Sequence, residues 1–445
     1  MIKNNLFLFF ASSLPALIVC IIYSYFFPIS DISYDRNYIH AAEHILEKGY
    51  YTGYNSLPLY PYFLAILFKV FGTNYFVSIF FQAFFHGLTA YLLAKIAKFY
   101  NSRWFYPTLI ISSLWPHLLW RTTYIYPETL FILLIVLSLY FVLLFLSKKN
   151  IFYFLLSSIF LGLSLLTKSS NILVLFILPI LYFFLLYKKE NYSFLSSIKL
   201  IIIYFLLFSF ILSFQFFRIY KETGYFGYSY QSGSILLGYT YPCLAQKFGC
   251  GSKNRDAMGL GVKLFDEKIE NSSPNESENL YYKHLVRTKI AFDLIKDLNF
   301  RNTIISATGG YLKLFFHNFT YDVFERLKLK SIHLSEFTGN FFNKMYQMLK
   351  KIFFEINHML LWFIAQFFLF FSRFIQILGL YSFLRIKKRV NNFYIFLLSA
   401  IFFLPIIIPV VGLGTIRYRA PLEPFLIILT ISGLFFIYNS LKKIK

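Results

Sequence analysis

Long apolar stretches alternate with short polar segments along most of the chain. The stretch from Leu6 to Phe27, for example, contains no charged residue. A helix of about 20 consecutive apolar residues spans the hydrocarbon core of a bilayer. The apolar pattern therefore predicts about ten transmembrane helices, within a range of about nine to twelve. They are expected at 5–27, 74–99, 104–121, 127–147, 151–168, 171–187, 198–217, 355–382, 393–413 and 420–440.

Two long regions interrupt this pattern and divide the chain. We expect an all-α integral membrane protein with a transmembrane module at 1–217, a large loop region at 218–354 and C-terminal transmembrane helices at 355–445. A shorter loop at 28–73 follows the first helix, and the large loop precedes the last three helices. We expect the first helix to remain uncleaved, because no small-residue cleavage pattern follows it.

Composition and charge agree with a membrane protein and give it an orientation. The chain is 58% hydrophobic and only 14% charged, with a net charge of +23. Its basic residues are spread over short loops, so they orient the chain in a membrane and do not indicate nucleic-acid binding. They concentrate on the cytoplasmic side if both termini lie in the cytoplasm. Both long loops then face the outer side.

A few charged residues are not explained by this orientation. Four basic residues lie at outer helix ends, where the positive-inside pattern does not require them: Arg121, Lys168, Arg417 and Arg419. Most acidic residues outside the large loop also fall at the outer face: Asp31, Asp35, Glu43, Glu47, Glu128, Glu355 and Glu423. Ionisable groups at membrane depth are costly and indicate function by default. Carboxylates and cations on one surface favour a site for an anionic substrate.

The first outer loop contains two expected helices at the membrane interface. Residues 35–48 place apolar side chains on one helical face and mostly charged side chains on the other. Residues 58–72 form a second, more apolar piece. Asp35 has a structural alternative as the N-cap of the first helix. Residues 40–44 match the zinc-binding pattern H-x-x-E-H, but the solvated face of an interfacial helix explains them without a metal ion.

Six short blocks of residues follow one another along the chain, all on the predicted outer face. They are Asp35-Arg-Asn-Tyr38 with Gly49-Tyr50; Pro58-Leu-Tyr-Pro61 with Phe71-Gly72; Trp115-Pro116 with Tyr126-Pro-Glu128; Gly162-Leu-Ser-Leu-Leu-Thr-Lys168; Arg218 to Gly224 with Ser232-Gly233; and Arg417-Tyr-Arg419-Ala-Pro421-Leu-Glu-Pro424. Together these blocks resemble the GT-C class of membrane glycosyltransferases. That superfamily includes protein O-mannosyltransferases and bacterial lipid A aminoarabinose transferases, which use polyprenyl-phosphate sugars as donors.

The resemblance implies the GT-C fold and a mechanism. An acceptor hydroxyl would attack the anomeric carbon in a single displacement with inversion, and Asp35 would take its proton. The family often places this aspartate four residues before a tyrosine, whereas Asp35 precedes Tyr38 by three. Asp31 precedes Tyr34 by the same number, so Asp31 is the alternative base. Four basic residues are candidates for binding the leaving phosphate: Arg417, Arg419, Lys168 and Arg121.

Structural explanations stand beside these roles. Glu128, the acidic residue of the expected substrate site, follows a proline in the first turn of a helix, where an acid is favoured structurally. A lysine at a helix end, such as Lys168, also extends toward the membrane surface. Arg417 and Arg419 have a possible structural partner in Glu423. We expect no metal ion and no cofactor, because arginine can hold a monophosphate leaving group.

The resemblance also implies a location and partners. The chain would lie in a bacterial inner membrane, with cytoplasmic termini and a periplasmic active site. Its partners would be a polyprenyl-phosphate sugar, membrane lipids and an acceptor, which is lipid A or lipopolysaccharide, a polysaccharide or a protein. Cys243 and Cys250 lie in the large loop on the oxidising side, so we predict a disulfide between them. Two free thiols are the alternative.

Two other classes of membrane protein use similar outer faces. A transporter or flippase for an anionic or lipid-linked substrate would also need charged residues, but transporters tend to have internal repeats and charges at the membrane midplane. The sequence has no evident repeat, and its unexplained charges lie at the outer edge. A ligase that transfers O-antigen to lipid A is the second class. The block at Asp35, directly after the first helix, favours the GT-C interpretation over it.

Overall fold

The computed structural model describes residues 2–26, 33–51, 56–190, 192–246, 255–316, 343, 347, 359–385, 390–404 and 416–444. Every regular element in these ranges is a helix. Six of the described helices are long and apolar enough to cross a membrane. They are α1 (Ile2–Phe26), α4 (Tyr75–Tyr100), α7 (Glu128–Lys148), α10 (Phe194–Thr223), α19 (Met359–Arg385) and α21 (Glu423–Ile444). The prediction of an all-α integral membrane protein is confirmed.

The described chain also contains shorter apolar helices. They are α3 (Leu59–Phe71), α8 (Ile151–Thr167), α9 (Val174–Phe184) and α20 (Val390–Phe403). A π-helical turn, Leu185–Lys189, continues α9. The 3-10 helix η9 (Ile416–Leu422) leads directly into α21. Each predicted transmembrane segment therefore contains at least one observed helix.

The predicted single helix at 104–121 is wrong. The structure has two helices there, α5 (Phe105–Ser113) and α6 (Pro116–Arg121), which follow the short 3-10 helix Ser102–Trp104. Trp115 is extended, with φ −66° and ψ 110°. Proline has no N–H group to donate, and it disfavours the helical conformation of the residue before it. Pro116 therefore starts a new helix instead of continuing the old one.

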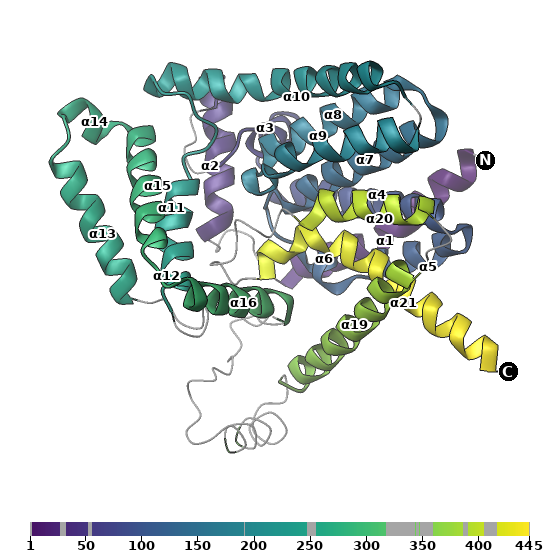
Figure 1. The fold of residues 1–445 in the computed structure, drawn as a ribbon. Helices are drawn as coiled ribbons and strands as arrows, with labels where there is room; N and C mark the ends of the chain where they lie inside the picture. Colours follow the sequence, from purple (N-terminus) through teal and green to yellow (C-terminus); the bar gives the residue numbers. More distant parts are fainter. Residues whose placement is uncertain are drawn as a thin grey trace.

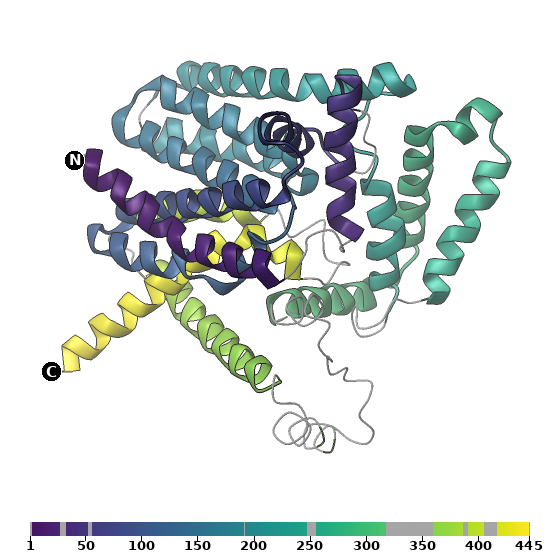
Figure 2. The same cartoon turned by 180° about the vertical axis from the view of Figure 1, so that it is seen from behind.

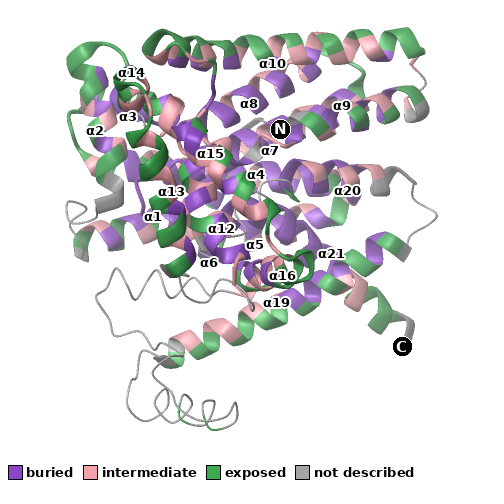
Figure 3. Cartoon of the chain, turned by 60° about the vertical axis from the view of Figure 1, so that its left-hand side comes forward, coloured by how far each residue is buried: buried purple, intermediate pink, exposed green. Residues whose placement is uncertain are grey.

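Helix α7 forms the centre of the bundle, whereas α10 lies on its outside. Phe131, Ile135 and Leu139 of α7 are fully buried, and α7 packs against α8 and α4. On α10, a stripe of apolar side chains is exposed instead: Ile202, Leu206, Phe210, Phe214 and Phe217. Exposed positions recur along α10 (Figure 3). An apolar face of this kind suits contact with lipid tails, which do not require polar side chains.

Two helices follow α1 in the described part of the chain. Helix α2 (Ser33–Lys48) covers the expected amphipathic segment, and α3 covers the second piece. Tyr60, Leu64 and Phe68 form the buried face of α3. Gly72 has a φ of 72°, which glycine adopts without steric cost, and it ends α3. The side chain of Asn74 then caps α4 by accepting a hydrogen bond from the N–H of Phe76.

The large loop region forms a helical lobe at one end of the molecule. Its helices are α11 (Ser232–Ile235), α12 (Tyr241–Leu244), α13 (Arg255–Glu270), α14 (Pro274–Glu278), α15 (Leu280–Lys296) and α16 (Phe300–Phe316), with a π-helical turn at Leu236–Thr240. Helix α2 stands between this lobe and the bundle (Figures 1 and 2). The described ends of the chain lie on the side of the bundle away from the lobe (Figures 1 and 2).

Candidate active site

Three charged side chains from remote parts of the chain meet at the start of α7. The Oε1 atom of Glu128 accepts hydrogen bonds from Nζ of Lys168 at 2.9 Å and from Nε of Arg417 at 2.6 Å. Glu128 is fully buried. Its other oxygen, Oε2, is buried without a hydrogen-bond partner in the described part of the chain. We call Glu128, Lys168 and Arg417 the cavity cluster, because two of them line the cavity described below.

Aromatic rings hold both cations of the cavity cluster. The guanidinium carbon of Arg417 lies 3.9 Å from the ring centre of Tyr126, and Nη2 donates to the hydroxyl of Tyr38 at 3.5 Å. Nζ of Lys168 lies 5.0 Å from the ring centre of Tyr418. Such contacts attract a cation to the face of a ring while leaving its other side accessible. Burial raises the pKa of Tyr38 to about 12, although Arg417 opposes the shift, so its hydroxyl stays protonated at neutral pH.

A cavity of about 530 Å³ opens above the cavity cluster. One wall comes from the bundle and α2, and it carries Lys168 and Arg417: Asn37, Tyr38, Tyr126, Pro127, Thr167, Lys168, Ser169, Ser170, Ile172, Arg417 and Tyr418. The other wall comes mainly from the lobe, and we call it the lobe wall: Ser56, Leu57, Tyr228, Ser229, Gln231, Ser232, Ile235, Leu236, Tyr281 and His284. The described lobe wall contains hydroxyl, amide and aromatic groups but no lysine or arginine. The cavity lining therefore combines two cations with uncharged polar, aromatic and apolar groups.

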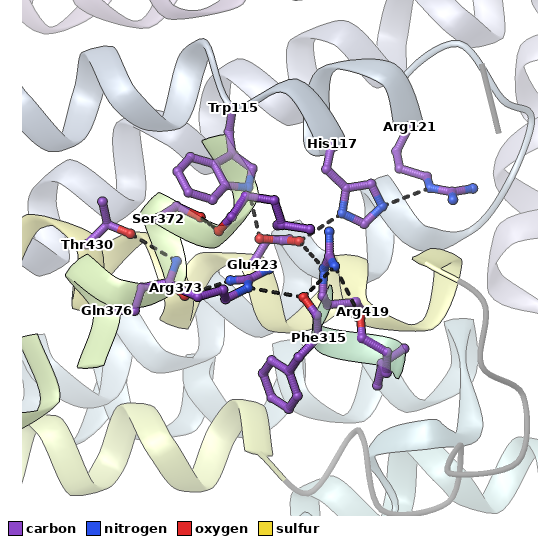
Figure 4. A network of polar contacts seen from close by, with 12 residues as sticks. Trp115, His117, Arg121, Phe315, Ser372, Arg373, Gln376, Arg419, Glu423 and Thr430 are labelled. Carbon is purple, nitrogen blue, oxygen red and sulfur yellow. Dashed lines mark hydrogen bonds and ion pairs between the residues drawn. The ribbon is translucent and has the colours of Figure 1, made fainter. Parts of the chain in front are cut away.

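A second charged group, centred on Glu423, is buried in the protein (Figure 4). Oε1 of Glu423 accepts from Nε of Arg419 at 2.7 Å and lies 2.9 Å from Nδ1 of His117. Its Oε2 accepts from the indole N–H of Trp115 at 2.9 Å. Nε of Arg121 donates to Nε2 of His117 at 3.3 Å. We call Trp115, His117, Arg121, Arg419 and Glu423 the buried network.

The buried network also fastens the last helix of the lobe to the bundle. Nη1 of Arg419 donates to the carbonyls of Leu314 and Phe315, at 3.1 and 3.0 Å. Nε of Arg373 on α19 donates to the same carbonyl of Phe315 at 3.1 Å. The last carbonyls of a helix have no partner within it, and cations are favoured beside them. Arg419 and Arg373 therefore hold the described end of α16 against the bundle.

The geometry fits the result of a comparison with known families. Residues 55–214 match the family model described as dolichyl-phosphate-mannose-protein mannosyltransferase. This match supports the GT-C superfamily of membrane glycosyltransferases for the chain. The matched segment runs from residue 55 into α10 and includes Glu128 and Lys168. No curated protein matches the chain.

The predicted phosphate-binding residues of the glycosyltransferase fall into two groups. Lys168 and Arg417 line the cavity. Arg419 is only 2% exposed and belongs to the buried network. Arg121 is 3% exposed, bonds His117 and lies over the ring of Tyr124. The pairing of Arg419 with Glu423 is the structural alternative given by the sequence, and the structure contains it.

The predicted base lies only partly within the described structure. Asp31 is outside the described residues, and Asp35 is described only as a position in the first turn of α2. That position precedes Tyr38 by three residues on the same helix, and residues three apart lie on one helical face. Cys243 is disulfide-bonded, and Cys20 is a free, buried thiol. Cys250, the predicted partner of Cys243, lies outside the described residues.

Several residues of the site were not singled out from the sequence. Tyr126 and Tyr38 could have been found from the sequence, because both lie in blocks that resemble the superfamily. Ser232 lies in such a block as well, but a serine carries no obvious function there. His284 had no signal, since a single histidine on an amphipathic helix is usually structural. In the described chain, no group of three or more His, Cys, Asp or Glu residues is arranged to hold a metal ion.

Proposed function

We propose that this glycosyltransferase transfers a sugar from a polyprenyl-phosphate carrier to a hydroxyl group of a cell-envelope acceptor. The acceptor is lipid A or lipopolysaccharide, a polysaccharide or a protein, and the reaction takes place at the periplasmic face of a bacterial inner membrane. The observation that carries this proposal is the cavity cluster at one side of a cavity lined by hydroxyl and aromatic groups. Aromatic faces and hydroxyl groups suit a sugar ring, and paired cations suit a phosphate.

The charges of the cavity cluster match the donor. With its side chains ionised, the cluster combines two cations and one carboxylate, so it carries a net positive charge beside the cavity. A sugar linked to a lipid through phosphate is a phosphodiester and carries a negative charge. When the sugar leaves, the phosphate gains a second charge. Arg417 and Lys168 would stabilise that developing charge from fixed positions, which requires little reorganisation during the reaction.

Asp35 is the proposed base. Its helix position lies one turn before Tyr38, whose hydroxyl contacts Arg417, and residues with this spacing have Cβ atoms about 5–6 Å apart. The acceptor oxygen would attack the anomeric carbon as the bond from that carbon to the phosphate oxygen breaks. The proton of the acceptor hydroxyl passes to the carboxylate of Asp35, and the bonding electrons leave with the polyprenyl phosphate. The configuration at the anomeric carbon is inverted.

Sugar transfer in membranes that contain the enzyme tests this proposal. Labelled polyprenyl-phosphate sugars would be supplied to the wild type and to Asp35→Asn, Asp31→Asn and Glu47→Gln at equal protein levels. Glu47→Gln is the matched control, because Glu47 is an exposed acid on the same helix. We expect Asp35→Asn to lose activity by about 10²–10⁴-fold and the control to retain it.

The other outcomes of this assay are also informative. Loss of activity in Asp31→Asn alone would move the base to Asp31 and keep the reaction. Full activity in both aspartate variants would refute the proposed base. If the wild type transfers no sugar from any polyprenyl phosphate while a known enzyme works in the same assay, the transferase proposal fails. A transporter or flippase would then be the function to test.

A further inference from the structure

On the lobe wall, His284 of α15 holds two groups of α11. The N–H of Gly233 donates to Nδ1 of His284 at 3.0 Å, and Oγ of Ser232 lies 3.3 Å from Nε2. His284 is only 6% exposed. A Cβ atom at position 233 would lie 2.9 Å from Nδ1 and would clash with the carbonyl oxygen of His284. Only glycine therefore lets α11 sit this close to the ring.

These contacts determine which ring nitrogen of His284 carries the proton. A backbone N–H can only donate, so Nδ1 must present its lone pair to Gly233. In the neutral ring Nε2 then carries the hydrogen. The carbonyl of Tyr230 also lies against the ring and favours a ring N–H, while burial and Arg287 keep the pKa of His284 near 4. The ring is therefore neutral at physiological pH, with its single N–H at Nε2.

The direction of the Ser232 hydroxyl follows from this tautomer. Because Nε2 carries a hydrogen, it has no lone pair to accept a bond from Ser232. The hydrogen on Nε2 also faces the backbone carbonyl of Tyr230, so Ser232 can only accept from Nε2, and its own hydrogen is not donated to His284. In the described chain, its side chain has no other hydrogen-bond partner, it is exposed, and it lines the cavity. Its O–H group is therefore available as a donor to a molecule in the cavity.

We propose that Ser232 donates a hydrogen bond to a hydroxyl oxygen of the transferred sugar, and that His284 is the positioning residue that fixes the direction of this bond. The inference rests on the proposed function, because it takes the cavity as the donor site. The phosphate of the donor is expected beside Arg417 and Lys168, which line the same cavity. An uncharged hydroxyl on the lobe wall suits the uncharged oxygens of a sugar. Ser232 would therefore help to select which sugar is transferred.

The test removes single hydroxyl groups from the enzyme and from the donor and measures how the two losses combine. Transfer from a polyprenyl-phosphate hexose and from its singly deoxygenated analogues would be measured for the wild type, Ser232→Ala and Ser234→Ala. Ser234 is the matched control, because it lies on α11 but outside the cavity lining, near Nη1 of Arg287. We expect Ser232→Ala to raise the KM for the complete donor about 3- to 10-fold, with kcat unchanged.

The deoxygenated donors identify the contact itself. One analogue should lower kcat/KM of the wild type but not lower it further in Ser232→Ala, since the bond is already lost. If every analogue lowers kcat/KM by the same factor in Ser232→Ala as in the wild type, the proposal is overturned. The proposal is also overturned if Ser232→Ala and Ser234→Ala have the same KM for the donor while Arg417→Ala loses transfer activity in the same assay. A wild type that transfers nothing would refute the proposed function and this inference with it.

Two further variants separate positioning from folding. His284→Asn keeps an acceptor near the N–H of Gly233 but removes the N–H that faces Ser232. It should show the raised KM and the altered donor preference of Ser232→Ala without a large loss of thermal stability. Ser232→Thr keeps the hydroxyl and should restore the donor preference. If His284→Asn leaves donor preference unchanged, His284 has no positioning role; if Ser232→Thr behaves like Ser232→Ala, the hydroxyl is not the group that matters.

Discussion

The cavity cluster and the buried network are built from the same parts but differ in how completely those parts are paired. Each has a glutamate in the first turn of a helix, Glu128 on α7 and Glu423 on α21, and each takes an arginine from η9. Both oxygens of Glu423 accept hydrogen bonds. Glu128 receives both of its bonds on Oε1 and leaves Oε2 without a partner in the described structure.

The difference indicates different roles. The donors around Glu423 are used up within the protein, so the buried network stabilises the attachment of the lobe. In the cavity cluster, Arg417 and Lys168 face a cavity, so part of their positive charge is available to a ligand. A fully paired buried charge is typical of structure, whereas a partly paired charge beside a cavity indicates binding.

The largest effect should come from breaking the buried network. Arg419→Ala would leave Glu423 buried without its main cation and would remove two bonds to the end of α16. Losing one partner of a buried ion pair costs about 3–5 kcal/mol. We expect a much lower melting temperature and less folded protein in detergent, measured by thermal unfolding followed on size-exclusion chromatography. Unchanged stability would show that this network does not hold the lobe.

The corresponding change in the cavity cluster should affect activity instead. Arg417→Ala removes a fixed cation beside the proposed phosphate site, and removing such a group from a transition state costs about 10²–10³-fold in rate. Lys168 still pairs Glu128 in this variant, and the bonds of Arg419 to α16 remain, so the melting temperature should fall less than in Arg419→Ala. Steady-state transfer assays and thermal unfolding on the same preparations separate the two effects. Equal loss of stability in both variants would remove the distinction between the two regions.

The sequence could predict that these charged residues belong to functional or structural polar groups. It could not predict which of them join the cavity cluster and which join the buried network. One sequence signal is common to four basic residues, namely positive charge at a helix end that is predicted to face the outer side: Lys168, Arg417, Arg419 and Arg121. A 3-10 helix has about three residues per turn, so residues two apart point to different faces. Arg417 and Arg419 therefore separate, one toward the cavity and one into the protein. Which of them faces the cavity depends on how η9 packs against α7 and α16.

The helices were easier to predict than the site. Apolar runs long enough to span a bilayer gave the transmembrane segments, because that pattern is set by the membrane itself. Pro116 alone did not predict that the helix would end there, since some helices accommodate proline with a kink. The lobe wall was not predictable, because Ser232 and His284 are brought together by contacts between α11 and α15.

A moderate effect is expected where the C-terminal helices cross. A Cβ atom at Gly433 of α21 would clash with the carbonyl of Ile375 on α19. Gly433→Ala should force the helices apart and destabilise the protein by about 1–3 kcal/mol. Because neither Gly433 nor Ile375 lines the cavity, KM for the donor should stay unchanged in the folded fraction. A changed KM would show that the crossing also shapes the cavity.

The smallest effect concerns pH and separates His284 from the rest of the protein. Burial, aided by Arg287, lowers the pKa of His284 to about 4, whereas an unfolded histidine has a pKa of about 6.5. Between these values the unfolded state binds the extra proton. The contribution of His284 is therefore complete above about pH 6.5 and is lost as the pH falls toward 4. From pH 7 to 5.5 the wild type should lose about 1 kcal/mol of stability through this group. His284→Asn should remove that part of the slope, as measured by thermal unfolding at each pH. Parallel slopes in the two proteins would mean that other groups cause the loss and that His284 is not held neutral by its contacts on the lobe wall.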